Sequence, residues 1–204
     1  MKKNIYVVCS LIFAFMAVNA WADSITFVLT TPNTGLSGYS GPYASISITL
    51  TSPTIADIAV TALPGFLIGG AHAFDLNTNG SASYSGLSYI GGNDKTNFSS
   101  EGTGNVDGFG SFNFRLKDSG GYNGAVSQLS FTLTGSTWSS AADVLTPNAS
   151  GYHGAGHIFD IGPTGANATG YAANGSTPVP EPATMLLLGS GLVGLWAFRK
   201  KFKK

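Results

Sequence analysis

The residues that could hold a metal ion or exchange protons are few, and the three histidines are the first to consider. His153 and His157 are four residues apart, but Gly154, Ala155 and Gly156 separate them, so a shared helical face cannot be assumed. A zinc site needs further ligands, and the His-Glu-x-x-His pattern of zinc proteases is absent from the sequence. We therefore expect loop or core histidines and no metal centre.

A second candidate site is a run of oxygen-bearing side chains. Asp75, Asn77 and Asn79 are followed by a glycine, in the order that opens a calcium-binding EF-hand loop. The twelfth position, which holds a bidentate glutamate in an EF-hand, is Gly86, and no helices flank the run, so an EF-hand is excluded. Two interpretations stay open: a loosely bound calcium ion, here or at residues 105–108, and an Asn-Gly turn with no cofactor.

The sequence contains no motif of a known nucleophile or nucleotide site. No serine has the Gly-x-Ser-x-Gly spacing, and there is neither a P-loop nor a dinucleotide fingerprint. We therefore predict no catalytic residues and a protein that is not an enzyme. Paired carboxylates for glycoside hydrolysis stay open, which makes a secreted hydrolase the third hypothesis for function.

Aromatic side chains could bind carbohydrate by stacking on sugar rings. We expect half or more of them to pack in the core or against turns. Trp138 is the preferred ligand-binding candidate, and a carbohydrate-binding module is the alternative function. The full set of candidates is Tyr39, Tyr43, Tyr84, Tyr89, Tyr122, Trp138 and Tyr152.

The elements that would position these residues are short strands. The chain has 204 residues, enough for one domain, and 10% are charged, against roughly 25% in an average soluble protein. Apolar and hydroxyl residues alternate in runs that glycine, proline and asparagine separate, and no long amphipathic helix is present. We predict an all-β ectodomain at residues 23–171, a single β-sandwich or jelly roll. The strand candidates are residues 24–31, 44–51, 55–62, 71–76, 83–90, 111–117, 127–134 and 156–161.

The charge is segregated along the chain. Between residues 23 and 182 three basic residues accompany all ten acidic ones, whereas both ends are basic and flank apolar segments. An acidic domain repels phosphate backbones, so nucleic acid is excluded as a partner. Basic residues beside apolar segments are typical of membrane topology signals.

The N-terminus has the three parts of a secretory signal peptide, at residues 1–22. A basic start precedes an apolar run, and Ala20 and Ala22 form the small-x-small pattern that signal peptidase cleaves. We predict cleavage before Asp23, with cleavage after Ala20 as the alternative. The single cysteine, Cys9, would be removed with this segment, and the mature chain would have no disulfide.

The C-terminus combines a proline motif, an apolar run and a basic tail. Residues 172–182 are rich in small residues and proline and are predicted to be a linker that ends in Val179, Pro180, Glu181 and Pro182. Residues 183–198 are uncharged and would span about 24 Å as a helix, slightly short of the ~30 Å bilayer core. Residues 199–204 are basic and should stay in the cytoplasm, which places the ectodomain outside.

This tail resembles the PEP-CTERM sorting signal, in which a Pro-Glu-Pro motif precedes a single helix and a basic cluster. Pro180, Glu181 and Pro182 match the motif, residues 183–198 the helix and residues 199–204 the cluster. The resemblance implies processing by exosortase, a membrane-embedded transpeptidase of Gram-negative bacteria that make extracellular polysaccharide. It also implies a precursor anchored in the inner membrane and a product at the cell surface or outside the cell.

The function that we expect from these features is non-catalytic. The resemblance implies a structural or adhesive role in a polysaccharide-rich biofilm or extracellular matrix. The expected partners are signal peptidase, exosortase, the membrane and extracellular polysaccharide.

Overall fold

The computed structural model describes residues 23–92, 96–162, 165–174 and 179–180. The predicted signal peptide, with Ala20 and Ala22, lies outside these residues. So do Glu181, Pro182, the predicted membrane helix at 183–198 and the basic tail at 199–204. In the part of the chain that is described, no helix is long and apolar enough to cross a membrane.

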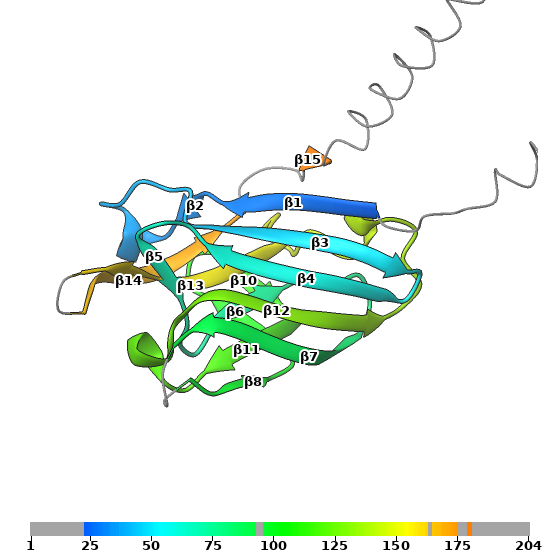
Figure 1. Cartoon of the computed structure of the whole chain (residues 1–204). Helices are drawn as coiled ribbons and strands as arrows, with labels where there is room; N and C mark the ends of the chain where they lie inside the picture. Colours follow the sequence, from blue (N-terminus) through cyan, green and yellow to red (C-terminus); the bar gives the residue numbers. More distant parts are fainter. Residues whose placement is uncertain (1–22, 93–95, 163–164, 175–178, 181–204) are drawn as a thin grey trace, which may run out of the picture.

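The described chain is all-β, as the sequence predicts. Its strands form a 13-stranded antiparallel sheet and a separate two-stranded hairpin. Helical structure within the described ranges is limited to short 3-10 turns at Thr34–Leu36, Gly121–Gly124 and Ala141–Asp143. The large sheet folds back on itself, so that its two halves lie face to face (Figure 1).

The front layer contains the longest strands. Their alternation of apolar and hydroxyl residues buries one side of each strand and leaves the other side partly exposed, as in the burial pattern of Ala44–Ser52. In spatial order the layer consists of β1 (Asp23–Leu29), β3 (Ala44–Ser52), β4 (Ile55–Ala62), β12 (Val126–Gly135) and β7 (Ala82–Gly91).

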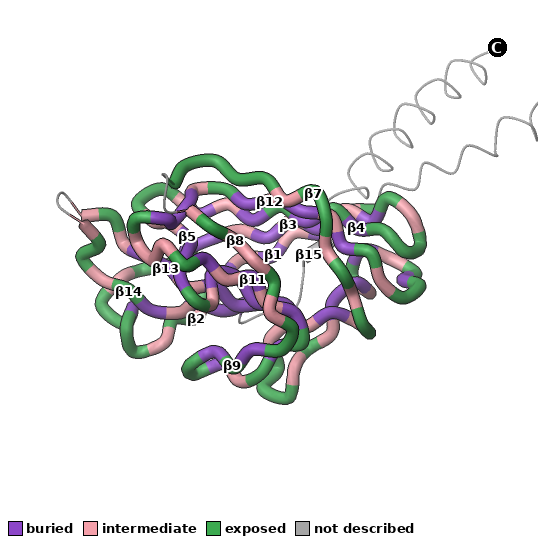
Figure 2. Tube along the Cα trace, turned by 90° about the horizontal axis from the view of Figure 1, so that it is seen from below, coloured by how far each residue is buried: buried purple, intermediate pink, exposed green. Residues whose placement is uncertain are grey.

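The back layer joins the front one through a short strand that pairs with both β12 and β13, which is where the sheet folds over. Figure 2 shows buried residues along the strands and exposed residues in the connecting loops. Between the layers the rings of Phe114 and Phe131 stack with their centroids 5.6 Å apart. The connecting and back strands are β5 (Phe66–Ile68), β13 (Gly154–Ile161), β14 (Ala166–Ala173), β6 (Phe74–Leu76), β11 (Phe114–Asp118) and β8 (Phe98–Ser100).

The two-stranded hairpin covers part of the outer face of the back layer. It consists of β9 (Gly104–Val106) and β10 (Gly110–Phe112). Its apolar side chains form a second small core with two alanines, Ala155 of β13 and Ala173 of β14. Because these alanines are small, the hairpin can lie close to the sheet. The next outward-pointing side chains along β13 and β14 lie beyond the edge of the hairpin.

Most predicted strands are confirmed. The short strands β5, β8 and β9 lie outside the predicted ranges, and three further differences have local causes. The strand predicted at 71–76 starts only at Phe74, because a turn occupies the preceding residues. The strand predicted at 111–117 is interrupted at Asn113, whose side-chain oxygen accepts hydrogen bonds from the backbone N–H and the hydroxyl of Thr78. β14 was not predicted, because its alanine, glycine and asparagine content resembles a linker more than a strand.

The described chain ends beside its own beginning. β14 continues to Ala173, two residues beyond the predicted end of the ectodomain. After it, β15 (Val179–Pro180) pairs antiparallel with Ile25 and Thr26 of β1. A two-residue strand, β2 (Thr31–Pro32), pairs with β14 and extends the other half of the sheet.

Candidate functional site

The three residues proposed as calcium ligands turn to different partners. Asp75 is fully buried in β6, while Asn77 donates to the carbonyl oxygen of Thr146 at 3.1 Å and Asn79 donates to Asp143 at 2.9 Å. Among the residues that the structure describes, no three His, Cys, Asp or Glu side chains lie close enough to hold a metal ion. Each of the three side chains is thus engaged with a separate protein partner, His72 for Asp75, Thr146 for Asn77 and Asp143 for Asn79.

Trp138 lies in the core, which corrects its assignment as a sugar-stacking platform. Its side chain is 1% exposed, and the ring lies so close to Gly135 that a Cβ added there would be 2.6 Å from Cζ2. The indole nitrogen donates to the carbonyl oxygen of Asn79 at 3.0 Å. A ring covered in this way has no face to offer to a ligand, and Tyr43, with 0% exposure, has none either.

A network of charged side chains lies on the outer face of the back layer. Phe74 and Leu76 point into the core, so Asp75 between them points outward, opposite Arg115 of β11. The Asp75 carboxylate lies 3.2 Å from Nδ1 of His72, and Arg115 Nη1 lies 3.3 Å from Nε2 of the same ring. Because a guanidinium only donates, Nε2 accepts and Nδ1 carries the proton that binds Asp75.

Burial dominates the electrostatics of this network. It raises the pKa of Asp75, and the nearby His72 and Arg115 oppose that shift. The backbone of Gly104 in the hairpin closes over the network, since a Cβ there would be 2.6 Å from Asp75 Oδ1 and 2.8 Å from Arg115 Cδ. Glu101 pairs with Arg115 and with Lys117 at the more exposed end. The network therefore anchors the hairpin to the sheet.

Next to this network, aromatic rings follow β13 and β14 in a continuous strip. The rings of His157 and Tyr171 stack at 4.7 Å with an interplanar angle of 28°, and His157 contacts Phe159 at 4.6 Å. Tyr122 packs edge-on against Phe159 at 5.6 Å, and His72 against Tyr171 at 6.0 Å. We call Tyr122, His157 and Tyr171, which are half-buried rather than buried, the aromatic strip.

The histidine of the aromatic strip is uncharged near neutral pH. Burial lowers the pKa of His157 to about 4, against an ordinary value of 6.5. Its Nε2 lies 2.6 Å from the hydroxyl of Thr169, which is exposed. Burial, together with the negative charges of Asp75 and Asp107, raises the pKa of Tyr171, so its hydroxyl also stays neutral. The strip thus offers apolar ring surface with neutral polar groups beside it.

One hydrogen-bonding residue fixes the position of the strip. Asn33, in the loop after β2, accepts from the backbone N–H of Tyr171 at 2.9 Å and donates to Asp107 of the hairpin at the same distance. Sequence reasoning included Tyr122 among its aromatic candidates, considered His157 only as a metal ligand and did not select Tyr171. These two residues are 14 positions apart and meet only because His157 pairs with Tyr171 in the register of β13 and β14.

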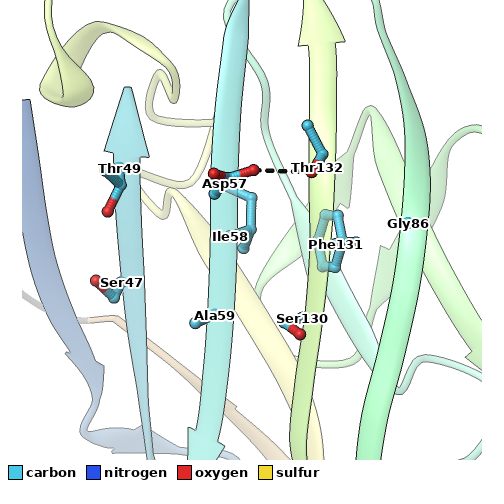
Figure 3. A pocket seen from close by; sticks show the side chains of 9 residues that line it. All are labelled: Ser47, Thr49, Asp57, Ile58, Ala59, Gly86, Ser130, Phe131 and Thr132. Atoms are coloured by element: carbon cyan, nitrogen blue, oxygen red, sulfur yellow. Dashed lines mark hydrogen bonds between the residues drawn. The ribbon is translucent and has the colours of Figure 1, made fainter. Parts of the chain in front are cut away.

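The outer face of the front layer has a different character. Hydroxyl side chains stand opposite one another across its strands, and the central part has a hollow of about 230 Å³ above Ala59 and Gly86 (Figure 3). Asp57 supplies the carboxylate of the hollow and accepts from Thr132 at 2.8 Å. The hydroxyl residues that line the hollow are Ser47, Thr49, Ser130 and Thr132.

These surfaces carry groups that suit binding. Both nitrogens of His72 are engaged, by Asp75 and Arg115, so this ring has no free position for a substrate. The His157 ring contacts the Thr169 hydroxyl and the rings of Phe159 and Tyr171. The aromatic strip can stack on a flat apolar face, and the hollow can exchange hydrogen bonds with a polar surface.

These observations define a class of protein: an all-β domain with half-buried aromatic rings on one outer face and hydroxyls on the other. The PEP-CTERM protein-sorting motif matches residues 178–201, so the chain carries the sorting signal that the sequence predicts. This motif implies an exported protein that exosortase processes. No curated protein and no solved structure matches the chain.

Proposed function

We propose that this protein is a non-catalytic β-sandwich ectodomain that exosortase delivers to the cell surface or the extracellular matrix. There it would have a structural or adhesive role in polysaccharide-rich material. The observation that carries the proposal is the sorting motif at residues 178–201, at the C-terminal end of a domain with a closed core. In the precursor, residues 183–198 would anchor the chain in the inner membrane until the motif is cleaved.

The positions of Asp23 and of residues 179–180 support this order of events. β1 starts at Asp23, the predicted product of signal peptidase, and β15 pairs with the same strand two residues further along. Both processing signals thus adjoin one edge of the domain. A precursor held at both ends could therefore face the membrane with a single edge and keep both outer faces of the domain away from it.

The first test is the intact mass of the protein from cells with and without an active exosortase. We expect a product that begins at Asp23 and ends between Pro180 and Pro182, and only in the strain that has exosortase. Replacing Glu181 with alanine should leave the tail on the chain, whereas Thr177→Ala, just before the matched residues 178–201, is the control. A tail that persists in both strains would mean a plain membrane anchor and would remove the basis of the proposal.

The second candidate function is carbohydrate binding, which the aromatic strip favours. Tyr122, His157 and Tyr171 come from three separate segments and present ring surface on one face of the sheet. Pyranose rings have an apolar face of C–H groups that packs on aromatic rings, and their hydroxyls need nearby neutral hydrogen-bonding groups. The exposed Thr169 hydroxyl beside His157 meets that need.

Binding to purified exopolysaccharide tests this second function. Removing one stacking ring costs about 1–2 kcal/mol, which corresponds to a loss of roughly 5- to 30-fold in affinity. We expect such a loss for Tyr171→Ala and for Tyr122→Ala. Tyr89→Ala is the control, since Tyr89 is 46% exposed on another part of the surface. Equal retention of all three variants would exclude the aromatic strip as a sugar site, while the intact-mass result would be unaffected.

A further inference from the structure

One edge of the front layer is bound by the start of the sorting motif. β1 pairs with β3 along its whole length, so its other edge presents backbone N–H and C=O groups to a further strand. β15 lies antiparallel on that edge, with Val179 opposite Thr26 (Figure 1). Pro180 lies opposite Ile25. Both residues of β15 belong to residues 178–201, which match the PEP-CTERM signal.

The chain leaves β14 beside this edge. Thr30, the residue after β1, donates its backbone N–H to the carbonyl oxygen of Ala173 at 3.0 Å, so the end of β14 lies next to the end of β1. The edge of β14 is itself occupied here. Asn33 donates its backbone N–H to the carbonyl oxygen of Tyr171 at 2.8 Å, and β2 pairs with residues 172–173. The chain therefore starts beside the open edge of β1 and not beside an open edge of its own strand.

A short tether holds the motif near β1. Asn174 is buried, and its side-chain oxygen accepts from two backbone N–H groups at the start of β13, at 2.9 and 3.0 Å. Val179 follows five residues later, so it stays within roughly 18 Å of this anchor. The step from Thr30 back to Thr26 along β1 covers about 13 Å, which is within that reach. A tether of this length gives an effective concentration on the order of millimolar, so even a weak strand pair is populated.

The strand pair is weak apart from its tether. Of the two residues of β15, only Val179 has a backbone N–H, because the ring of Pro180 replaces the hydrogen. Proline is tolerated at the edge of a sheet, where no strand follows to accept that hydrogen bond. The sequence of the motif therefore suits a contact that forms at the sheet edge and opens again.

We propose that the edge of β1 is the docking site of the proline motif in the precursor, and that exosortase cleaves the chain only after the motif leaves this edge. The inference rests on the sorting function proposed above. Continued by two residues, the register of β15 would set residues 181–182 opposite residues 23–24.

The same backbone groups serve both bound states of the motif. A strand at a sheet edge and an extended peptide in the cleft of an enzyme are both recognised through their backbone N–H and C=O groups. The motif can therefore bind either β1 or exosortase, and not both at once. The folded domain would thus limit the rate at which the tail is removed.

A disulfide between the two strands tests the docking in the full-length chain. A Cys9→Ser background has no other cysteine, and directly opposite residues of an antiparallel pair lie within disulfide range. Thr26→Cys is combined with Val179→Cys. The control combines Val28→Cys with Val179→Cys, because residue 28 lies on the same face of β1 but two positions out of register. In precursor from cells without exosortase we expect at least tenfold more linkage in the first pair, and equal linkage would overturn the proposal.

The same chains in cells with an active exosortase test the competition. Linked chains should lose residues 183–204 at least tenfold more slowly than the single variants Thr26→Cys and Val179→Cys, which cannot form the link. Reduction should restore cleavage, and the reduced double variant should unfold at the temperature of the parent chain. Linked chains that are cleaved as fast as the single variants would overturn the proposal.

A failure of the sorting function would be visible separately. The parent chain would then keep residues 183–204 in both strains, while the disulfide yield without exosortase would still show whether the motif docks on β1. Docking together with a tail that persists in both strains would mean that β15 only closes the sheet edge, and it would overturn the proposed control of cleavage.

Discussion

Replacing Trp138 separates a structural role for this ring from a ligand-binding one. The side chain fills the core at the end of β12, against Gly135, and its indole nitrogen donates to the carbonyl oxygen of Asn79. That carbonyl also accepts from the hydroxyl of Ser136 at 3.0 Å. Trp138→Phe therefore leaves the acceptor with one bond and a small void, whereas Trp138→Ala leaves a large cavity.

The two variants should differ in stability by an amount that the packing predicts. Truncating a buried tryptophan to alanine costs about 3–5 kcal/mol, out of a typical total of about 5–15 kcal/mol for a domain. For a domain of roughly 150 residues, 1 kcal/mol shifts the melting temperature by about 2–4 °C, so Trp138→Ala should melt roughly 6–20 °C lower. Trp138→Phe loses a hydrogen bond and part of the ring, at a cost of about 1–3 kcal/mol, and its melting temperature should lie between those of the parent chain and Trp138→Ala.

Thermal unfolding followed by circular dichroism, together with retention on exopolysaccharide, measures both roles. Below its melting temperature Trp138→Phe should keep the carbohydrate affinity of the parent chain, because its ring is 1% exposed. A variant that melts like the parent chain would contradict the packing argument. A variant that keeps its stability but loses carbohydrate affinity would restore Trp138 as a ligand residue.

Three further changes test other parts of the structure. Gly104→Ala should lower the free energy of unfolding in chemical denaturation by about 1–3 kcal/mol, because the new Cβ would be 2.6 Å from Asp75 Oδ1. Gly38→Ala is the control: a Cβ there would have no atom within 4 Å, so the free energy of unfolding should change by less than about 0.5 kcal/mol. His157 has a pKa of about 4 when folded and 6.5 when unfolded, so between these values the unfolded state binds a proton that the folded state does not, and stability falls as the pH drops from about 6.5 to 4. In chemical denaturation at several pH values, the free energy of unfolding of His157→Gln should therefore depend less steeply on pH than that of the parent chain. An equal dependence in both chains would contradict the assignment. Asn174→Ala should cost about 1–3 kcal/mol in the same assay, because the buried side-chain oxygen accepts from two backbone N–H groups at the start of β13, at 2.9 and 3.0 Å; no loss would mean that this residue lies outside the cooperative unit.

The sequence alone was sufficient for the fold class and for most strands, because both depend on local pattern. Residues 45–50 alternate hydroxyl and apolar side chains, and the period of a strand places the apolar ones on a single face. The sorting tail was likewise predictable, since its motif, apolar run and basic cluster are contiguous in the chain. β14 was not predicted because its residues have little strand preference, and its pairing with β13 stabilises it instead.

The tertiary structure decided which of these residues share a surface. Sequence reasoning preferred Trp138 to Tyr122 as a ligand candidate, but an aromatic ring serves equally well in a core and on a surface. The packing buried Trp138 against Gly135, and the register of β13 with β14 placed His157 beside Tyr171. Local pattern fixes the face to which a side chain points, but its neighbours depend on strand pairing between distant segments, which no local pattern encodes.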